Sequence, residues 1–389
     1  MFFVFLGFLK HSIGAIMKLK ITRTILLVAL ILLTTSACSK KTYIPLDSQP
    51  RIINQTQLKT RSPQKTITIA AVGDIMLGTN FPSTEYLPED GGRSLFSSVK
   101  EYLKNADITF GNLEGSFSDS GKCLKACSDP KKCYAFRMPE KYVHLLTKTG
   151  FNLLSLANNH INDFGNEGRE TTIDLLKTNN INFAGVETHP STVFTINGIK
   201  YGFCAFSPNN GVPDIRDIDK ACETIKSLSQ VSDIVIVSFH GGAEGADNRH
   251  VTRNDEFFYG ENRGNVYNFA HKVIDAGADI VLGHGPHISR AIELYKDRFI
   301  AYSMGNFCTY ARFNLTGING IAPIFQLNIN KKGAFVSGKI ISIEQKHKKG
   351  PKPDSGNRAL KEIIELTKSD FPETTLYISN TGEIKKKLR

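Results

Sequence analysis

The sequence predicts an α/β protein, and three observations support that prediction. Short runs of β-branched and aliphatic residues alternate along the chain with helical stretches. Five of these runs end in a cluster of polar residues that contains Asp, Asn, Glu or His. With 389 residues, of which 41% are hydrophobic, the chain can bury the core of one large domain or of two ordinary ones. Strands that alternate with helices favour a largely parallel sheet, and such sheets bind ligands at the carboxyl ends of their strands.

The five strands that precede the polar clusters are short and rich in Ile, Val and Leu. In chain order they are expected at 66–74 (TITIAAVGD), 106–110 (ADITF), 151–156 (FNLLSL), 232–239 (SDIVIVSF) and 278–282 (ADIVL). Helices are expected at 167–179 and 265–277, and Gly277 closes the second of them. A β-hairpin is expected over 192–206, because Asn197-Gly198 favours a primed two-residue turn.

The first 38 residues resemble a signal peptide. The apolar run Ile25–Leu33 is too short to span a bilayer comfortably, and it follows a basic stretch that begins at Met17, where we expect translation to start. The run leads into TTSAC, which resembles a bacterial lipobox ending at Cys38, although Thr35 stands where that pattern prefers Leu or Val. A lipidated Cys38 would anchor the chain in the membrane, and plain secretion is the alternative. Both place the mature protein outside the cytoplasm.

Polar segments follow and precede the predicted domain, which spans residues 66–345. Residues 39–65 are aperiodic and contain proline, as expected of a flexible tether, and residues 346–389 form a Lys-rich C-terminal extension with a short helix near ALKEIIELTK. The net charge of +11 is concentrated in these end regions, so they are either solvated tails or contacts for a polyanion or an anionic bilayer. The chain has no RNA-binding aromatic motif and no helix-turn-helix spacing, which argues against nucleic acid as a partner.

The cysteines fit an oxidising compartment. Six of the seven remain when Cys38 is set aside. Three of these, Cys123, Cys127 and Cys133, lie close together with no fourth ligand nearby, which disfavours a zinc knuckle. A local disulfide is the preferred interpretation, with the third thiol paired elsewhere or free.

The polar clusters supply the ligand types that divalent metals of the Mn, Fe or Zn class prefer. We expect them to meet at one sheet edge, where two ions about 4 Å apart could promote phosphoryl hydrolysis. The candidates are Asp74, Asn112, Glu114, Asn158, Asn159, His160, Asp163, His240, His284 and His287. Each also has a simpler reading as a helix cap, a turn residue or a hydrogen-bonded core histidine. Arg137 is either a surface charge or a contact for an anionic substrate group.

Six motifs occur in the order found in the CapA family of bacterial capsule synthesis proteins, of the poly-γ-glutamate type. They are GDIMLG, GNLEG, LANNHINDFG, SFHGGAEG, GADIVLGHGPH and AYSMGNF, and the resemblance covers about residues 66–345. The domain of that family is similar to calcineurin-like metallophosphoesterases. The resemblance therefore implies a four-layer αββα sandwich with two mixed β-sheets.

The resemblance also implies a role for each matching residue. Metal ligands are implied at Asp74, Glu114, Asn159, His240, His284 and His287, in a site that holds two ions in the related enzymes. His160 stands where the proton donor to the leaving group is expected, with Asp163 beside it as a second catalytic candidate. Substrate-facing positions are expected at Asn112, Arg137, Glu244 and Asn306.

Three departures from the pattern weaken the expectation of catalysis. The first strand has no histidine two residues after Asp74, the final pair is His-x-x-His rather than His-x-His, and the fourth motif reads His-Gly-Gly where the family often has His-Trp-Gly. The expected function is extracytoplasmic capsule or exopolymer biosynthesis with a metal-dependent hydrolase-like site acting on an anionic polymer or its precursor. The alternative is a non-catalytic subunit that binds or exports polymer within a membrane synthase complex.

Overall fold

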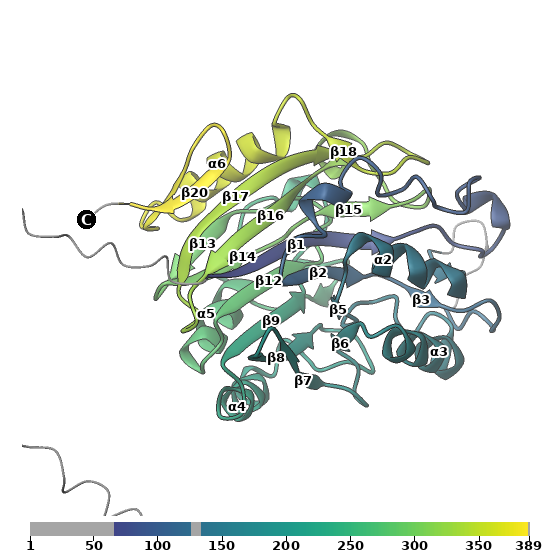
Figure 1. Cartoon of the computed structure of the whole chain (residues 1–389), viewed down its shortest axis with the longest axis horizontal. Helices are drawn as coiled ribbons and strands as arrows, with labels where there is room; N and C mark the ends of the chain where they lie inside the picture. Colours follow the sequence, from purple (N-terminus) through teal and green to yellow (C-terminus); the bar gives the residue numbers. More distant parts are fainter. Residues whose placement is uncertain (1–65, 126–133, 388–389) are drawn as a thin grey trace, which may run out of the picture. The chain divides into compact units, whose positions relative to one another are not determined.

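A computed structural model describes residues 66–125 and 134–387, which include a large mixed β-sheet. Its strands run in the order β19-β20-β17-β16-β1-β2-β5-β6, with β15 also paired to β1 and β18 to β17 (Figure 1). Strands β2, β5, β6 and β15 continue the parallel direction of β1, whereas β16 to β20 pair antiparallel. The bounds are β1 Ile67–Met76, β2 Ile108–Leu113, β5 Leu153–Ser155, β6 Asn182–Ala184, β15 Asn306–Thr309, β16 Ile321–Ile329, β17 Phe335–Glu344, β18 Lys352–Pro353, β19 Leu376–Ile378 and β20 Glu383–Lys386.

A second mixed sheet has the order β13-β14-β12-β9-β8-β7. Its four central strands are parallel, and its two edge strands are antiparallel to their neighbours. The bounds are β7 Ser191–Ile196, β8 Ile199–Phe206, β9 Ile234–His240, β12 Ile280–His284, β13 Ile292–Tyr295 and β14 Arg298–Ala301. Two short two-stranded pairs complete the strands, β3 Ser116–Phe117 with β4 Arg137–Met138 and β10 Phe257–Phe258 with β11 Glu261–Asn262.

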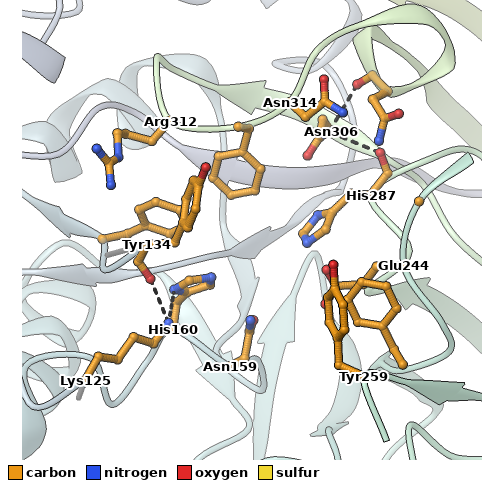
Figure 2. Close-up of a pocket in the computed structure, with 15 residues that line it drawn as sticks. Lys125, Tyr134, Asn159, His160, Glu244, Tyr259, His287, Asn306, Arg312 and Asn314 are labelled. Atoms are coloured by element: carbon orange, nitrogen blue, oxygen red, sulfur yellow. Dashed lines mark hydrogen bonds between the residues drawn. The ribbon is translucent and has the colours of Figure 1, made fainter. Parts of the chain in front are cut away.

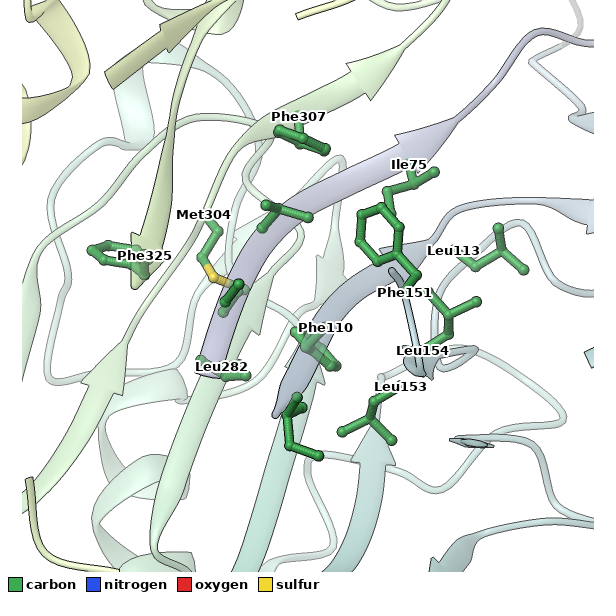
Figure 3. Packing of buried hydrophobic residues seen from close by; sticks show 14 of the residues in the cluster. Ile75, Phe110, Leu113, Phe151, Leu153, Leu154, Leu282, Met304, Phe307 and Phe325 are labelled. Carbon is green, nitrogen blue, oxygen red and sulfur yellow. The ribbon is translucent and has the colours of Figure 1, made fainter. Parts of the chain in front are cut away.

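The main core fills the space between the two sheets. Phe110 of β2 meets Phe203 of β8 with ring centroids 5.9 Å apart, and Phe299 of β14 meets Phe325 of β16 at 5.5 Å. Figure 3 shows this layer, with Leu282 of the small sheet facing side chains of the large one. Because the sheets share one apolar layer, the ends of their strands are held in a defined mutual position.

Helices cover the outer faces of the sheets. Helices α4 (Ile218–Ser229) and α5 (Val266–Asp275) pack on β8, β9 and β12 and bury a second apolar cluster there. Helices α2 (Val143–Thr149) and α3 (Gly165–Thr178) join the main cluster from the side of the large sheet. The architecture is therefore the predicted four-layer sandwich of two mixed sheets between helices.

The expected elements correspond closely to the observed ones. The five strands expected before polar clusters are β1, β2, β5, β9 and β12, and the two expected helices are α3 and α5. The expected hairpin is β7–β8, and Asn197 and Gly198 have φ values of 52° and 77°, as a type I′ turn requires.

The C-terminal segment is integrated into the sandwich. Helix α6 (Arg358–Asp370) supplies the helix expected there, and β18 to β20 extend the large sheet. The amide of Ile292 in β13 donates to the Thr367 hydroxyl, while the amide of Ala359 donates to the Ser342 hydroxyl in β17. Helix α6 therefore contacts strands of both sheets, and residues beyond 345 belong to the same compact unit as the rest of the described domain.

Several predictions concern residues outside the described ranges. These are the signal peptide, the lipidation of Cys38, the tether 39–65, and any disulfide that involves Cys127 or Cys133. Within the described ranges, the thiols of Cys123, Cys204, Cys222 and Cys308 are free. The helices placed in those ranges are all too short or too polar to cross a bilayer.

The layer between the sheets predicts a large effect of truncating Phe325. Phe325 is fully buried against Phe299, so we expect Phe325→Ala to lower the free energy of unfolding by about 3–5 kcal/mol, measured by urea unfolding. Val336→Ala on β17 is the matched control, because Val336 is 44% exposed and we expect a change within about 0.5 kcal/mol. Equal unfolding midpoints for the two variants would contradict the proposed packing of the sheets.

Candidate metal centre

The polar clusters meet where the carboxyl ends of two different sheets face each other. Asp74, Asn112 and Glu114 come from β1 and β2 of the large sheet, whereas His240 and His284 end β9 and β12 of the small one. The expectation of a single sheet edge is therefore wrong. The two sheets pack face to face, so the ends of β1 and β2 meet the ends of β9 and β12 across the shared core.

The position of Asp74 depends on an irregularity in β1. The register of β1 shifts near Asp74 relative to both β2 and β15, and the Asp74 amide donates to the carbonyl of Gly305 at 2.9 Å. A Cβ on Gly73 would lie 1.8 Å from that same carbonyl oxygen, so only glycine allows the approach. A bulge of this kind redirects the side chain that follows it.

The Asp74 carboxylate is the hub of the cluster. It is fully buried and accepts a hydrogen bond from the Asn112 side chain at 2.9 Å. Its second oxygen lies 2.9 Å from Nδ1 of His287, and Nδ1 of His284 lies 3.3 Å from the first. Burial alone would raise the pKa of Asp74, but the contacts with His284 and His287 reverse this and hold the pKa below its ordinary value.

Glu114 is a second buried carboxylate, and few interactions offset the cost of burying its charge. Neither of its oxygens accepts a hydrogen bond from a described residue, and burial raises its pKa well above the ordinary value. Nε2 of His287 lies 3.5 Å from Oε1 of Glu114, and Nε2 of His160 lies 3.9 Å from the same oxygen. One ligand atom each from Asp74, Glu114 and His287 can be chosen so that all three lie within 4.8 Å of one another.

Buried polar atoms that lack hydrogen-bond partners are rare in proteins, and several residues of the polar clusters carry one or two of them. Among the described residues they include both oxygens of Glu114, both ring nitrogens of His240 and of His284, and the side-chain oxygens of Asn159 and Asn306. Carboxylate, imidazole and amide oxygen donors are those that Mn, Fe and Zn take. The chemistry of these donors therefore fits a divalent metal ion, with Asp74, Glu114, Asn159, His240, His284 and His287 as the candidate ligands.

His287 occupies a strained backbone position. Its φ is 57°, which is uncommon for a residue other than glycine, and nearby Gly285 has φ 116° with no room for a Cβ beside Gly241. Burial favours the neutral ring, but the Glu114 charge and the hydrogen bond to Asp74 prevail and raise the pKa of His287 to about 10. A proton on His287 thus supplies positive charge between the two carboxylates.

His160 forms a dyad with Asp163. Nδ1 of His160 lies 2.7 Å from the Asp163 carboxylate, which also accepts the Phe136 amide at 2.9 Å. Lys125 lies 2.9 Å from the other Asp163 oxygen and donates to the Tyr134 carbonyl at 2.8 Å. Nζ of Lys125 also lies 3.0 Å from Nδ1 of His160, so Lys125, His160 and Asp163 form one network. Nε2 is then the atom that faces Glu114.

A cavity of about 580 Å³ opens onto this cluster. Figure 2 shows Asn159, His160 and His287 pointing into it, with Arg312 and Tyr134 on one wall and Glu244 and Tyr259 on the other. Phe136 packs on the His160 ring at 4.1 Å between centroids. The other described residues that line it are Lys125, Gly245, Phe258, Asn306, Phe313, Asn314 and Asn319.

The remaining predicted site residues fall into two groups. Glu244 and Asn306 line the cavity, and Glu244 pairs with buried Arg263 at 3.1 Å. Asn112 supports Asp74, and Asn158 supports the loop by donating to Asn112 and accepting from the His160 amide.

Arg137 does not line the cavity. Its guanidinium binds Asn80 and the carbonyl of Gly121 and lies over the Phe164 ring, so it stabilises the loop that follows β3. Lys125, Arg312 and the aromatic residues of the walls do line it, and sequence reasoning missed them. They lie outside the six motifs or at their ends, and no local pattern marks them.

Comparison with known proteins agrees with this arrangement. A family model described as bacterial capsule synthesis protein PGA_cap matches residues 68–311. The chain belongs to this family. The matched region includes β1, β2, β5, β9, β12 and β15, which carry or immediately precede all six proposed metal ligands. The family resemblance drawn from the six motifs is thereby confirmed.

Individual relatives share the capsule description. The capsule biosynthesis protein CapA of Bacillus anthracis is 30% identical over 272 residues, which cover 64% of this chain and 61% of that protein. The PGA biosynthesis protein CapA of Bacillus subtilis is 26% identical over 252 residues, which cover 61% of each chain. The match therefore spans about 61% of the length of these two PGA_cap relatives.

Solved structures similar to this PGA_cap protein include two hydrolases. A 5'-nucleotidase precursor from Thermus thermophilus aligns with a TM-score of 0.40 at 12% identity, covering 78% of this chain and 59% of that one. A purple acid phosphatase from yellow lupin aligns with a TM-score of 0.37 at 12% identity, covering 81% and 57%.

The unpaired Glu114 carboxylate predicts opposite effects of one substitution on the metal-free and metal-bound chain. We expect Glu114→Gln to leave the metal-free protein as stable as the wild type or more stable, because it removes a costly buried charge. It should also abolish the stabilisation by Mn²⁺, about 2.7 kcal/mol when the ion is at 100 times its Kd. Thermal unfolding with and without chelator measures both effects.

Glu187→Gln is the control for that experiment, because Glu187 is exposed and lies outside the centre. Bound metal is counted by mass spectrometry for both variants and the wild type. Full metal stabilisation of Glu114→Gln would rule out Glu114 as a ligand.

The raised pKa of His287 predicts that the metal-free protein loses stability as the pH rises. Its proton is bound more tightly in the folded chain than in the unfolded one, so its contribution is fully present below about pH 6.5 and is lost by about pH 10. Within this window we expect the free energy of unfolding to fall by up to about 1.4 kcal/mol per pH unit, and His287→Gln should flatten the slope. His189→Gln is the control, since burial lowers the pKa of His189. Equal slopes in wild type and His287→Gln would refute the assignment.

Proposed function

We propose that this PGA_cap family member is a metal-dependent hydrolase or transferase that acts on an anionic capsule polymer, or on its precursor, outside the cytoplasm. The observation that supports this most directly is the set of unpartnered buried donors beside the His160–Asp163 dyad, at the base of one open cavity. A purely structural cluster would satisfy its buried polar atoms internally, because each one left unpaired costs free energy. A divalent metal centre, with two ions as the family resemblance implies, satisfies these atoms and accounts for their burial.

In this proposal, different residues bind the metal, position its ligands and orient the substrate. When bound, the metal would polarise a substrate oxygen and lower the pKa of a bound water. Asp74, Glu114 and the histidines would hold it, and Asn306 keeps His287 in place by donating to its carbonyl at 3.1 Å. The walls of the cavity orient the substrate and exclude water from the reacting bond.

His160 is the residue placed to move a proton. Asp163 contacts Nδ1 of His160 at 2.7 Å and so orients the ring with Nε2 toward the centre. Burial lowers the pKa of His160, and the charge of Asp163 partly opposes this. The resting ring is therefore neutral, so His160 accepts a proton at Nε2 before it donates one to the leaving group.

The location in the cell is part of the same proposal. The signal-like segment before Cys38 supports export, and a lipid on Cys38 would hold the domain at the membrane surface. An anionic polymer that emerges from a membrane synthase would pass this surface. Other subunits of such a synthase or export complex are the expected partners.

A second function is favoured by one observation. Met76 occupies the position where the related phosphoesterases carry a first-strand histidine, and its buried thioether accepts the Gly78 amide. A thioether is a poor ligand for Mn or Zn compared with imidazole. Weaker metal binding would leave a cleft that binds or exports polymer without cleaving it.

Substitution of His160 separates the two functions. With Mn²⁺ added, we expect His160→Ala to lower the rate of phosphodiester or γ-glutamyl hydrolysis by about 10²–10⁴-fold, as expected when a proton-transfer group is lost. His189→Ala is the control, since His189 is a partly buried histidine outside the cavity. A wild-type protein that binds polymer but shows no turnover with any metal would establish the binding function instead.

A further inference from the structure

The short hairpin β10–β11 presents aromatic side chains at the mouth of the cavity. Phe258 and Tyr259 both line the cavity, and their ring centroids lie 4.4 Å apart. Tyr259 is 94% exposed, and the neighbouring Phe257 is 60% exposed. Clustered aromatic surface of this kind is unfavourable in water, and it marks places where a ligand or partner binds.

The hairpin is fixed to the interior by a buried ion pair. Tyr259 and Gly260 have φ values of 47° and 82°, as a tight primed turn requires, so Tyr259 stands at the tip. At the base of the hairpin, the Arg263 amide donates to the Glu256 carbonyl at 2.8 Å. Both carboxylate oxygens of Glu256 accept hydrogen bonds from fully buried Arg290. The aromatic tip is therefore held in a defined position above the cavity.

The opposite wall carries another exposed aromatic ring. Tyr134 is 60% exposed, and Figure 2 shows it across the cavity from Tyr259 and Glu244. Deeper in the cavity, the Phe136 ring packs on the His160 ring with 4.1 Å between centroids. Aromatic surface thus extends from both sides of the mouth to the proton-transfer residue.

The polar groups between these rings suit hydroxyl groups better than a row of negative charges. Asn314 and Asn319 line the cavity and offer amide donors and acceptors, and the Glu244 carboxylate can accept from hydroxyl groups. The wall that contains Glu244, Phe258 and Tyr259 has no lysine or arginine among its described lining residues. A ligand with a carboxylate on every unit would find no positive charge on this wall, whereas a polyhydroxylated ligand would find hydrogen-bond partners.

We propose that the cavity binds a sugar ring beside a phosphate ester, so that the substrate class is a glycosyl phosphate. The ester lies at the metal centre, while Tyr259 and Tyr134 stack on the C–H faces of sugar units and Glu244 binds hydroxyl groups. The face of an aromatic ring is electronegative, which favours the polarised C–H bonds of a sugar over an anion. This inference rests on the proposed function, because it names the substrate class of the same site.

Calorimetric titration tests the proposal without requiring turnover. The probe is a glucosyl phosphonate, in which carbon replaces the bridging oxygen so that no ester bond to the sugar can be hydrolysed. It is titrated into the full chain in the presence of Mn²⁺. The ringless reference is 3,4-dihydroxybutyl phosphonate, which carries the same charge. We expect the sugar probe to bind about 5-fold more tightly or better, as expected for stacking on aromatic rings.

Tyr259 can be replaced without loss of internal packing, because it is 94% exposed. We expect Tyr259→Leu to weaken binding of the sugar probe by about 3–10-fold and to leave the ringless phosphonate unaffected. Tyr259→Phe keeps the aromatic face and should bind like the wild type. Tyr377→Leu is the matched control, since Tyr377 is 55% exposed on β19 and does not line the cavity.

Four results would overturn the proposal. The first two are equal affinity of the wild type for the two phosphonates and unchanged binding of the sugar probe by Tyr259→Leu. The third is tighter binding of a nucleoside phosphonate than of the sugar probe, which would indicate a site for a base. The fourth is a Tyr259→Leu defect confined to phosphatidylglycerol vesicles, which would make the hairpin a lipid contact.

The failure of the proposed hydrolase activity is recognised separately. In that case the sugar probe would still bind the wild type through Tyr259, while the wild type and His160→Ala showed the same lack of turnover with every metal. Turnover that is lost in His160→Ala, together with equal affinity for the two phosphonates, would instead retain the hydrolase and remove the sugar site.

Discussion

The contact between two buried carboxylates and the histidines around them is the constraint on which the rest of this structure depends. Asp74 and Glu114 are both fully buried, and moving a charge out of water costs several kcal/mol unless opposite charge compensates it. His287 provides that compensation to Asp74 directly, whereas it only approaches Glu114 to 3.5 Å, and both Glu114 oxygens lack a hydrogen bond from a described residue. The arrangement stores unfavourable electrostatic energy that a divalent cation would relieve.

The two-sheet core explains how such a cluster can be maintained. The apolar layer between the sheets supplies the stabilisation, and it also determines how closely the end of β1 approaches the ends of β9 and β12. Close approach requires glycine at Gly73 and Gly285, where a Cβ would overlap the backbone of Gly305 and Gly241. The stability of the fold and the geometry of the centre therefore have the same physical origin.

The cavity walls place charged and aromatic side chains beside the candidate metal centre. Lys125 and Tyr134 precede and follow residues 126–133 in the sequence, while Arg312 and Phe313 follow β15, and together they place positive charge and aromatic surface beside the dyad. On the opposite wall, Glu244 is held by Arg263, and its loop is fastened by fully buried Arg290, which binds both oxygens of Glu256 and the carbonyl of Ala243. Lys125, Tyr134, Arg312 and Phe313 thus come from segments other than those that carry the candidate metal ligands.

The sequence by itself determined the α/β class, the strands that end in polar clusters, and the residue types of the metal centre. These properties are local, because each depends on a short apolar run followed by Asp, Asn, Glu or His. Only the tertiary structure decided that the clusters come from two sheets, that His284 and His287 converge on Asp74, and that Arg137 supports a loop while Arg312 lines the cavity. Those outcomes depend on sheet packing and on contacts between residues distant in the chain, which no local pattern encodes.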